Sequence, residues 1–334
     1  MAQWLKDNSS DSDIVISTRA RIARNVSGIP FPHKIRNTDK EELVKRLAIQ
    51  KFCSNGSDFI LKEMKDLSQN ERNALVEQHV ISRDLVGRDD GAVITSPDGS
   101  ISIMLMEEDH YRIQYLTGGF NPEEAYQVAG NVEKMLGSSV SYAYNNRFGY
   151  LTACPTNLGT GLRIGVMMHL KGHVLSNNIK DLQSGLGRLG LTIRGAYGEG
   201  STPIADCYQI SNQVTLGISE QEIVQNIRQF VGRLINQERD VRNILYKNNK
   251  LELEDSVYRA YGILKNAKKM SSDEANRYLS TLSFGVSLGI MKPCRETDIY
   301  RLMIETMPAT LRREAETAIE RDIRRAEIIQ KVID

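Results

Sequence analysis

Three consecutive acidic residues, Glu107, Glu108 and Asp109, stand at the end of an apolar run and directly before His110. The run, Ile101–Met106, has the composition of a buried strand, so the acids would be gathered at one end of a sheet. A carboxylate in such a place can hold a cationic group and accept a proton from it. An acidic triplet can equally be a solvated turn, and the spacing alone leaves both interpretations open.

Arginines stand near several other expected strands, beside glycine-rich turns. Arg19 and Arg21 follow the first apolar run, Asp13–Ser17, and alternate residues of an extended chain point to the same side. A guanidinium donates two parallel hydrogen bonds and stays charged, which suits a polyphosphate. Any single arginine is usually an ordinary surface residue, but several together predict a phosphate clamp. The other arginines of this set are Arg24, Arg112, Arg163 and Arg194.

The glycine pattern does not fit the two common nucleotide-binding frames. Neither GxxxxGK[ST] nor a GxGxxG that opens a helix occurs in the chain. Glycines in the segments 154–163 and 194–201 suit turns or a close approach of the backbone to a ligand. A nucleotide site would therefore have to be built in another way.

The elements expected over residues 1–218 predict an α+β fold, in which a largely antiparallel sheet is flanked by helices. Ala92–Ser96 and Ile101–Met106 enclose the turn-forming Pro97-Asp98-Gly99 and read as a hairpin. Gly149–Cys154 is a further predicted strand, and Pro122–Leu136 a predicted helix. This region is predicted to be a catalytic domain.

The pattern changes at Ser219, where Ser219–Glu222 forms a capping box. Residues 219–334 are predicted to be an all-helical C-terminal domain that ends in one helix over Pro308–Val332. Its apolar stripes exceed what a short bundle needs, which makes a homodimer possible. The stripe expected on the last helix consists of Leu311, Ala315, Ile319, Ile323 and Ala326.

Composition argues against several classes of protein. The 334 residues include 43 basic and 42 acidic ones, so direct nucleic-acid binding by a generally basic surface is not expected. The four cysteines include no CxxC pair, which argues against a zinc site or a disulfide framework. The N-terminus is polar, and no apolar segment approaches the ~18 residues of a membrane span. A cytoplasmic protein without membrane contact is predicted.

Three motifs in one order carry a resemblance to a known family: STRARIAR from Ser17, EEDHYR from Glu107 and CPTNLGTGLR from Cys154. Together they resemble the phosphagen (guanidino) kinases, to which creatine and arginine kinases belong, over roughly Ser17–Ser219. The resemblance implies transfer of a phosphoryl group from ATP to a guanidinium, with Mg²⁺ held through the ATP phosphates. It also implies that Glu108 is the catalytic carboxylate, with Glu107 beside it.

The same resemblance implies where the two substrates are bound. Cys154 and Glu199 would lie on the guanidinium side. ATP would be bound by residues of several segments, namely Ser17, Thr18, Arg19, Ala20 and Arg21, then His79 and Arg112, then Arg163, Ile164, Gly165, Val166 and Met167, and finally Arg194, Gly195, Ala196, Tyr197, Gly198 and Glu199.

Two departures from the small-molecule kinases narrow the resemblance. The first catalytic strand is expected near residue 13, so the helical N-terminal domain that closes over creatine or arginine is expected to be missing. The helical region after Ser219, the loop RGAYGEGS and the tail motif RDIRRA resemble the bacterial protein-arginine kinase (McsB) subfamily. In that subfamily the tail motif is associated with phosphoarginine binding and allosteric control. Its residues here are Arg321, Asp322, Ile323, Arg324, Arg325 and Ala326.

The subfamily resemblance implies phosphorylation of arginine side chains in proteins during the bacterial stress response. Implied substrates are a CtsR-type repressor and unfolded proteins, with an McsA-type activator as partner and a Clp protease acting on the marked proteins. Two alternatives remain open. The chain could phosphorylate a free small guanidino compound, or it could be a catalytically inactive regulatory adaptor.

Overall fold

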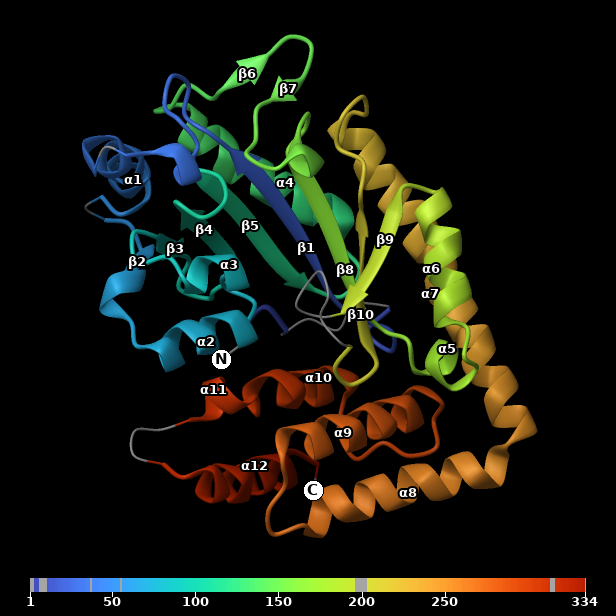
Figure 1. Cartoon of the computed structure of the whole chain (residues 1–334). Helices are drawn as coiled ribbons and strands as arrows, with labels where there is room; N and C mark the ends of the chain where they lie inside the picture. The colour runs from blue at the N-terminus through green and yellow to red at the C-terminus, as the bar shows by residue number, and fades with distance from the viewer. Residues whose placement is uncertain are drawn as a thin grey trace.

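A computed structural model describes residues 3–5, 11–36, 38–54, 56–195, 203–312 and 316–333. Its main feature is an eight-stranded sheet in the order β2-β3-β4-β5-β1-β8-β10-β9, in which every neighbouring pair is antiparallel (Figure 1). This confirms the predicted α+β class. The strands are β1 Val15–Arg24, β2 Ile60–Glu63, β3 Ala92–Thr95, β4 Ile101–Leu105, β5 Tyr111–Gly118, β8 Leu162–His169, β9 Leu191–Gly195 and β10 Cys207–Asn212, with a separate hairpin of β6 Tyr144–Asn145 and β7 Gly149–Tyr150.

One face of the sheet is buried under helices. Ala20 and Ile22 of β1 and Ile164 of β8 are at most 2% exposed in this core. The first half of α7 contributes apolar residues such as Ile227 and Val231 to the same core, so that half of α7 packs with the sheet. The helices of this face are α1 Thr38–Phe52, α4 Pro122–Gly137, α6 Ile179–Arg188 and α7 Glu220–Asn248.

Among the described residues, helices cover the opposite face only at its ends. The helices α2 Gln69–Glu77 and α3 Arg83–Val86 form a small core with residues of β3 and β4, among them Val93 and Met104. At the other end, residues of the sheet such as Ile16 and Leu116 pack against the C-terminal helices. Odd-numbered residues in the middle of β1 and β8, and the even-numbered Arg112 of the antiparallel neighbour β5, are left facing a cavity.

The C-terminal helices lie together below the sheet in Figure 1. They share a second core that includes Leu279 and Ile329 as well as the sheet residue Met167. These helices are α8 Lys250–Asn266, α9 Ser272–Ser287, α10 Glu296–Glu305, α11 Pro308–Leu311 and α12 Ala318–Ile333, while the short α5 Lys171–Leu175 follows β8.

The prediction of one helix over Pro308–Val332 is wrong. Two helices occupy this stretch, and α12 begins at a capping box in which Thr317 and Glu320 each bind the backbone N–H of the other. The predicted stripe is wrong at Ile319, which is 62% exposed, and at Ile323, which is 38% exposed. Its members Leu311 and Ala326 are buried, and Ala315 lies outside the described residues. The packed face of α12 is instead set by its neighbours α8 to α10, which receive Ala326, Ile329 and Ile333.

The predicted strand Gly149–Cys154 ends at Tyr150. Beyond it, the N–H of Leu151 donates to the carbonyl of Ala143 at 2.9 Å, and side chains bind further backbone groups. The N–H of Ala153 donates to Asp109 at 2.7 Å, and the carbonyl of Leu151 accepts from Asn25 at 3.0 Å. These two bonds hold residues 151–154 as a loop against the end of β1.

A buried ion pair on α7 joins the sheet to the C-terminal helices. Glu238 accepts from the backbone N–H of Gly172, at 2.7 Å, and from Nε of Arg242, at 2.6 Å. Arg242 also donates to the carbonyl of His169 in β8, at 2.6 Å, and to Oγ of Ser287 in α9, at 2.7 Å. Both charged side chains are nearly inaccessible to solvent, at 2% exposure or less.

Replacing Arg242 by alanine is expected to lower the free energy of unfolding by about 3–5 kcal/mol, because the Glu238 carboxylate then stays buried without its cation. Urea denaturation of the whole chain measures the loss. Arg259→Ala is the control, since Arg259 forms an exposed pair with Asp255 on α8 and should change stability by less than about 1 kcal/mol. Equal losses in the two variants would contradict the structural role of Arg242.

Candidate active site

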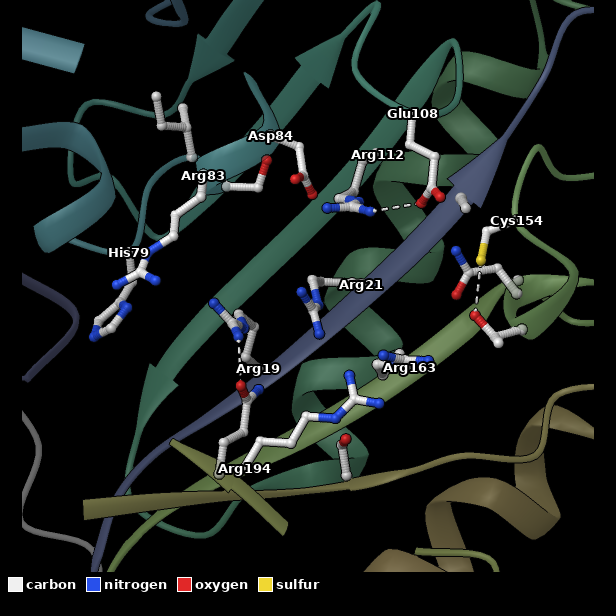
Figure 2. A pocket seen from close by; sticks show the side chains of 18 of the residues that line it. Arg19, Arg21, His79, Arg83, Asp84, Glu108, Arg112, Cys154, Arg163 and Arg194 are labelled. Atoms are coloured by element: carbon white, nitrogen blue, oxygen red, sulfur yellow. Dashed lines mark hydrogen bonds and ion pairs between the residues drawn. The ribbon is translucent and has the colours of Figure 1, made fainter. Parts of the chain in front are cut away.

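A cavity of about 380 Å³ opens on the partly covered face of the sheet (Figure 2). Among the described residues, its charged lining consists of six arginines and two carboxylates, Asp84 and Glu108. Five of the arginines lie on neighbouring or near-neighbouring strands because β1 sits between β5 and β8, with β9 at the edge beyond β10. The six are Arg19 and Arg21 of β1, Arg83 of α3, Arg112 of β5, Arg163 of β8 and Arg194 of β9.

The arginines crowd one another. Arg21 lies directly opposite Arg163 in the β1–β8 pairing, a like-charge arrangement that destabilises a sheet. Burial and then the nearby Arg112 and Arg163 lower the pKa of Arg19 to about 10. Burial and the neighbouring arginines also lower the pKa of Arg21, whose guanidinium forms no hydrogen bond or ion pair with any described residue. Such a cluster of crowded arginines suits the binding of a polyanion.

The three members of the acidic triplet have different partners. Glu107 is buried, accepts hydrogen bonds from Ser82 and from Arg112, and does not line the cavity. Asp109 is also buried and holds Asn25, at 2.6 Å, and the loop N–H of Ala153. The remaining acid, Glu108, lines the cavity, and Arg112 donates to it at 3.3 Å.

The environment of Glu108 makes it a better base than an ordinary glutamate. Partial burial raises its pKa above the usual 4.5, and the neighbouring Asp109 and Glu107 raise it further. Arg112 and a hydrogen bond with Cys154 act in the other direction without cancelling the rise. A carboxylate with a raised pKa holds an accepted proton more tightly, which suits proton abstraction from a cationic acceptor.

Cys154 lines the same end of the cavity as Glu108, and the two side chains lie near each other in Figure 2. Its Sγ is 3.0 Å from Oγ1 of Thr156, which also lines the cavity together with Asn157. The loop that carries all three residues is the one fixed to Asp109 through Ala153. The acid loop (residues 107–109) and the cysteine loop (residues 153–157) are therefore fixed to each other.

His79 lies at the opposite end of the cavity from Glu108 (Figure 2). Its backbone is left-handed, with φ at 61°, and its carbonyl accepts from Nε2 of Gln114 at 2.7 Å. Burial, and then the charge of Arg19, lower the pKa of His79 to about 3, so the ring is neutral near pH 7. His79 also lines a smaller adjoining pocket, together with Ser17 and Met167.

The structure does not bring every predicted site residue into the cavity. Thr18 and the alternate residues Ala20, Ile164 and Val166 are buried on the helix-covered side of the sheet. Gly165 faces the cavity side, where a Cβ would lie 2.2 Å from Gln209, and Gly195 ends β9. Ala196, Tyr197, Gly198 and Glu199 lie outside the described residues. Arg24 faces away and pairs with Glu133.

Sequence reasoning missed Arg83 and Asp84, which enter the cavity from α3. A four-residue helix gives no periodic signal, although Ser82 is an N-cap residue that accepts from the N–H of Leu85. It also missed Gln209, which accepts from Arg19 at 3.0 Å. Period-2 alternation along β10 would have placed Gln209 and Ser211 on one side, but not on the cavity side.

Comparison with known families matches two parts of the chain. Residues 40–241 match the family described as ATP:guanido phosphotransferase, C-terminal catalytic domain. Residues 250–334 match the protein-arginine kinase McsB C-terminal domain. The chain belongs to the ATP:guanido phosphotransferase family. The resemblance of its three motifs to guanidino kinases is thereby confirmed.

Relatives in this family are similar over the whole chain. The chain is 41% identical to the protein-arginine kinase of Bacillus subtilis over 337 residues, covering 99% of this chain and 93% of that protein. It is 42% identical to the protein-arginine kinase of Clostridium kluyveri over 324 residues, covering 95% of this chain and 94% of that protein.

Solved structures of guanido kinases share the fold. Lombricine kinase superposes with a TM-score of 0.61 at 26% identity, covering 72% of this chain and 70% of that one. The duplicated taurocyamine kinase of Schistosoma mansoni, with bound transition-state-analogue components, gives a TM-score of 0.63 at 26% identity. It covers 70% of this chain and 34% of that one.

Two further observations on this guanido phosphotransferase concern metal ions and membranes. Within the described ranges, no three His, Cys, Asp or Glu side chains gather as ligands for a metal ion. None of the described helices combines the length and the apolar character that crossing a membrane requires.

Replacing Arg21 by glutamine is expected to raise the free energy of unfolding by about 0.5–1 kcal/mol in the absence of nucleotide, because it removes the charge opposite Arg163. The same change should lower kcat/KM about 100-fold, since one donor to the transferring group is lost. Urea denaturation and steady-state kinetics measure the two effects.

Arg112→Gln is the matched control for Arg21→Gln. It should lower the free energy of unfolding by about 3 kcal/mol, because it leaves the buried Glu107 carboxylate without its cation. Destabilisation by both variants would show that the arginine cluster is not under repulsive strain.

Proposed function

We propose that this guanido phosphotransferase is a protein-arginine kinase, which transfers the γ-phosphate of ATP to the guanidinium of arginine side chains in proteins. The observation that carries the proposal is Glu108, a carboxylate with a raised pKa, at one end of a cavity whose other charged walls are mostly arginine. Full-length similarity to protein-arginine kinases supports a protein as the phosphate acceptor.

The nucleotide fits the arginine side of the cavity. Arg19, Arg21 and Arg163, with Arg112 and Arg194 beside them, can donate to the phosphate oxygens in pairs. At neutral pH a polyphosphate offsets the repulsion among these side chains, so binding of ATP and relief of strain in the sheet act together. The base would lie near His79, which lines both this cavity and the smaller pocket.

The acceptor guanidinium fits beside Glu108 and Cys154. A guanidinium has a pKa near ~13 and no free lone pair, so a nitrogen becomes nucleophilic only when a proton leaves. Glu108 accepts that proton, the nitrogen attacks the γ-phosphorus, and the bond from this phosphorus to the β–γ bridging oxygen breaks. ADP leaves with the electron pair of that bond. The arginines offset the charge on the transferring group throughout.

Mg²⁺ would be held mainly by the phosphate oxygens of ATP. Among described residues, Asp84 and Glu108 are the carboxylates of the cavity, a donor set suited to hydrogen-bonding metal-bound water rather than to caging the ion. Bound in this way, Mg²⁺ offsets phosphate charge.

The cellular role follows from the resemblance to the McsB subfamily. We place the enzyme in the cytoplasm, with a CtsR-type repressor and unfolded proteins as substrates and an McsA-type activator as partner. Phosphoarginine would then mark proteins for a Clp protease. The helical region after Ser219 is where we expect homodimer contacts, and we retain 1–218 and 219–334 as the proposed division of the chain.

Glu108→Gln is expected to lower kcat about 10²–10⁴-fold, because the proton acceptor is lost. Mg·ATP and casein are incubated with each variant, and intact mass, acid lability and site mapping identify phosphoarginine. In the wild type, activity should fall as the pH drops through the raised pKa of Glu108, so the acid limb of kcat/KM lies above pH 4.5. The residual activity of the variant should lack this limb.

Glu252→Gln, an exposed change on α8, is the control and should leave both rate and pH profile unchanged. Phosphorylation of free arginine alone would instead favour a kinase of small guanidino compounds. Absence of any phosphorylation by the wild type would favour the inactive adaptor.

The tail motif lies partly in a second cavity of about 510 Å³, which is lined by residues of α2 and α3 on one side and of α11 and α12 on the other. Arg321 lines it together with Arg83 and Arg312, which supports binding of an anionic group such as phosphoarginine. Arg325 has a different surrounding. It is fully buried and donates to the carbonyls of Thr306, at 2.8 Å, and Met270, at 2.7 Å.

Arg321→Ala should weaken the binding of free phosphoarginine about tenfold or more with little change in Tm, because one charged donor is removed from the cavity wall. Arg325→Ala should lower the free energy of unfolding by about 3–5 kcal/mol, because it removes a fully buried side chain and leaves the carbonyls of Thr306 and Met270 without their donor. Calorimetric titration and denaturation separate the two roles. A stable Arg325→Ala chain that loses binding would reverse the assignment.

A further inference from the structure

A small pocket of about 50 Å³ lies where the sheet meets the C-terminal helices. Ser17 of β1 and Met167 of β8 line it from the sheet, and Asn276 of α9 and Met303 of α10 line it from the helices. His79 belongs to the wall of this pocket and also to the wall of the arginine cavity. A ligand could therefore extend from one space into the other.

Asn276 stands out among the residues of this pocket. The residue is 5% exposed, and its Oδ1 has no hydrogen-bond partner among the described residues. Its Nδ2 is directed to Sδ of Met307 at 3.8 Å, a weak contact. A buried acceptor without a partner is costly, so such a group in a native protein calls for an explanation, of which a bound ligand is one.

We propose that Asn276 recognises the purine base of ATP, and this inference rests on the proposed use of ATP by the chain. Oδ1 accepts a hydrogen bond from the exocyclic amine of adenine, while the triphosphate extends past His79 to the arginines. Guanine carries a carbonyl oxygen at the same ring position, so two acceptors would face each other. Asn276 therefore selects ATP over GTP.

The walls of the pocket suit a flat ring. A purine is larger than the pocket as it stands, and three unbranched methionines, Met167, Met303 and Met307, can make room by changing rotamer. Trp4 and His79, whose ring centroids are 6.4 Å apart, supply aromatic surface for stacking.

The position of Asn276 gives this contact a second consequence. Asn276 lies on α9, whereas the phosphate-binding arginines lie on the sheet and α3. A single nucleotide would then bridge the sheet and the C-terminal helices. Binding of ATP would stabilise their contact, because the ligand interacts with both sides of it.

Asn276→Leu tests the assignment, because leucine has a similar size and no polar atom. Without nucleotide, the Tm should stay equal or rise, since an unsatisfied buried acceptor is removed. The KM for ATP should rise about 10- to 100-fold with kcat nearly unchanged, and the preference for ATP over GTP should fall by the same factor. The shift of Tm by ATP, compared with GTP, gives a readout that does not depend on turnover.

Asn266→Leu is the matched control. The Asn266 amide is exposed, donates to the carbonyl of Gly262 at 2.8 Å, and lies outside the pocket, so nucleotide preference should not change.

An unchanged ATP preference in Asn276→Leu would overturn the inference while leaving the kinase proposal intact. A lower Tm without nucleotide, with equal losses for ATP and GTP, would overturn it too, because it would show a purely structural role. If the wild type neither shifts its Tm with ATP nor phosphorylates arginine, the proposed function fails first.

Discussion

Mutual repulsion of arginine side chains on one face of the sheet is the constraint around which this molecule is arranged. Arg21 and Arg163 lie directly opposite each other in the pairing of β1 with β8, and Arg19 lies on the same face. A protein does not gather buried like charges for stability, so the arrangement has to be balanced by a bound polyanion and by a rigid frame. The frame is the helix-covered core on the other face of the sheet, where the alternate residues of the same strands are almost completely buried.

Arg112 is a cation of the cavity that is paired with carboxylates of the protein itself. Arg112 pairs with the buried Glu107 and also contacts Glu108, so it holds the acid loop at the edge of the arginine cluster. Asp109 fixes the same loop to the segment that carries Cys154. The result is that a single carboxylate of the triplet faces the cavity, with a raised pKa, beside the arginine cluster.

The C-terminal helices are part of the same physical unit as the sheet. Their core includes residues of β1, β5 and β8, and the buried pair of Glu238 and Arg242 binds both sides of the junction. The first family match ends at residue 241, within α7, and the second begins at residue 250, just after α7. The first half of α7 packs on the sheet. A nucleotide that reached Asn276 would add one more contact across this junction. Substrate binding and the position of the helices would then influence each other through shared binding energy.

The sequence alone determined the features that depend on neighbours along the chain. Alternation placed Arg19 and Arg21 on one side of a strand, the turn at Pro97-Asp98-Gly99 defined a hairpin, and the ordered motifs identified the family. Only the tertiary structure decided that Glu107 and Asp109 are buried away from the cavity, that Arg24 points away, and that Arg83 and Asp84 take part. It also divided the last predicted helix and buried Arg325 in place of Ile319 and Ile323. The physical reason is that periodicity fixes relations within one element, whereas the direction of a loop side chain depends on partners brought close by the fold, such as Ser82 for Glu107.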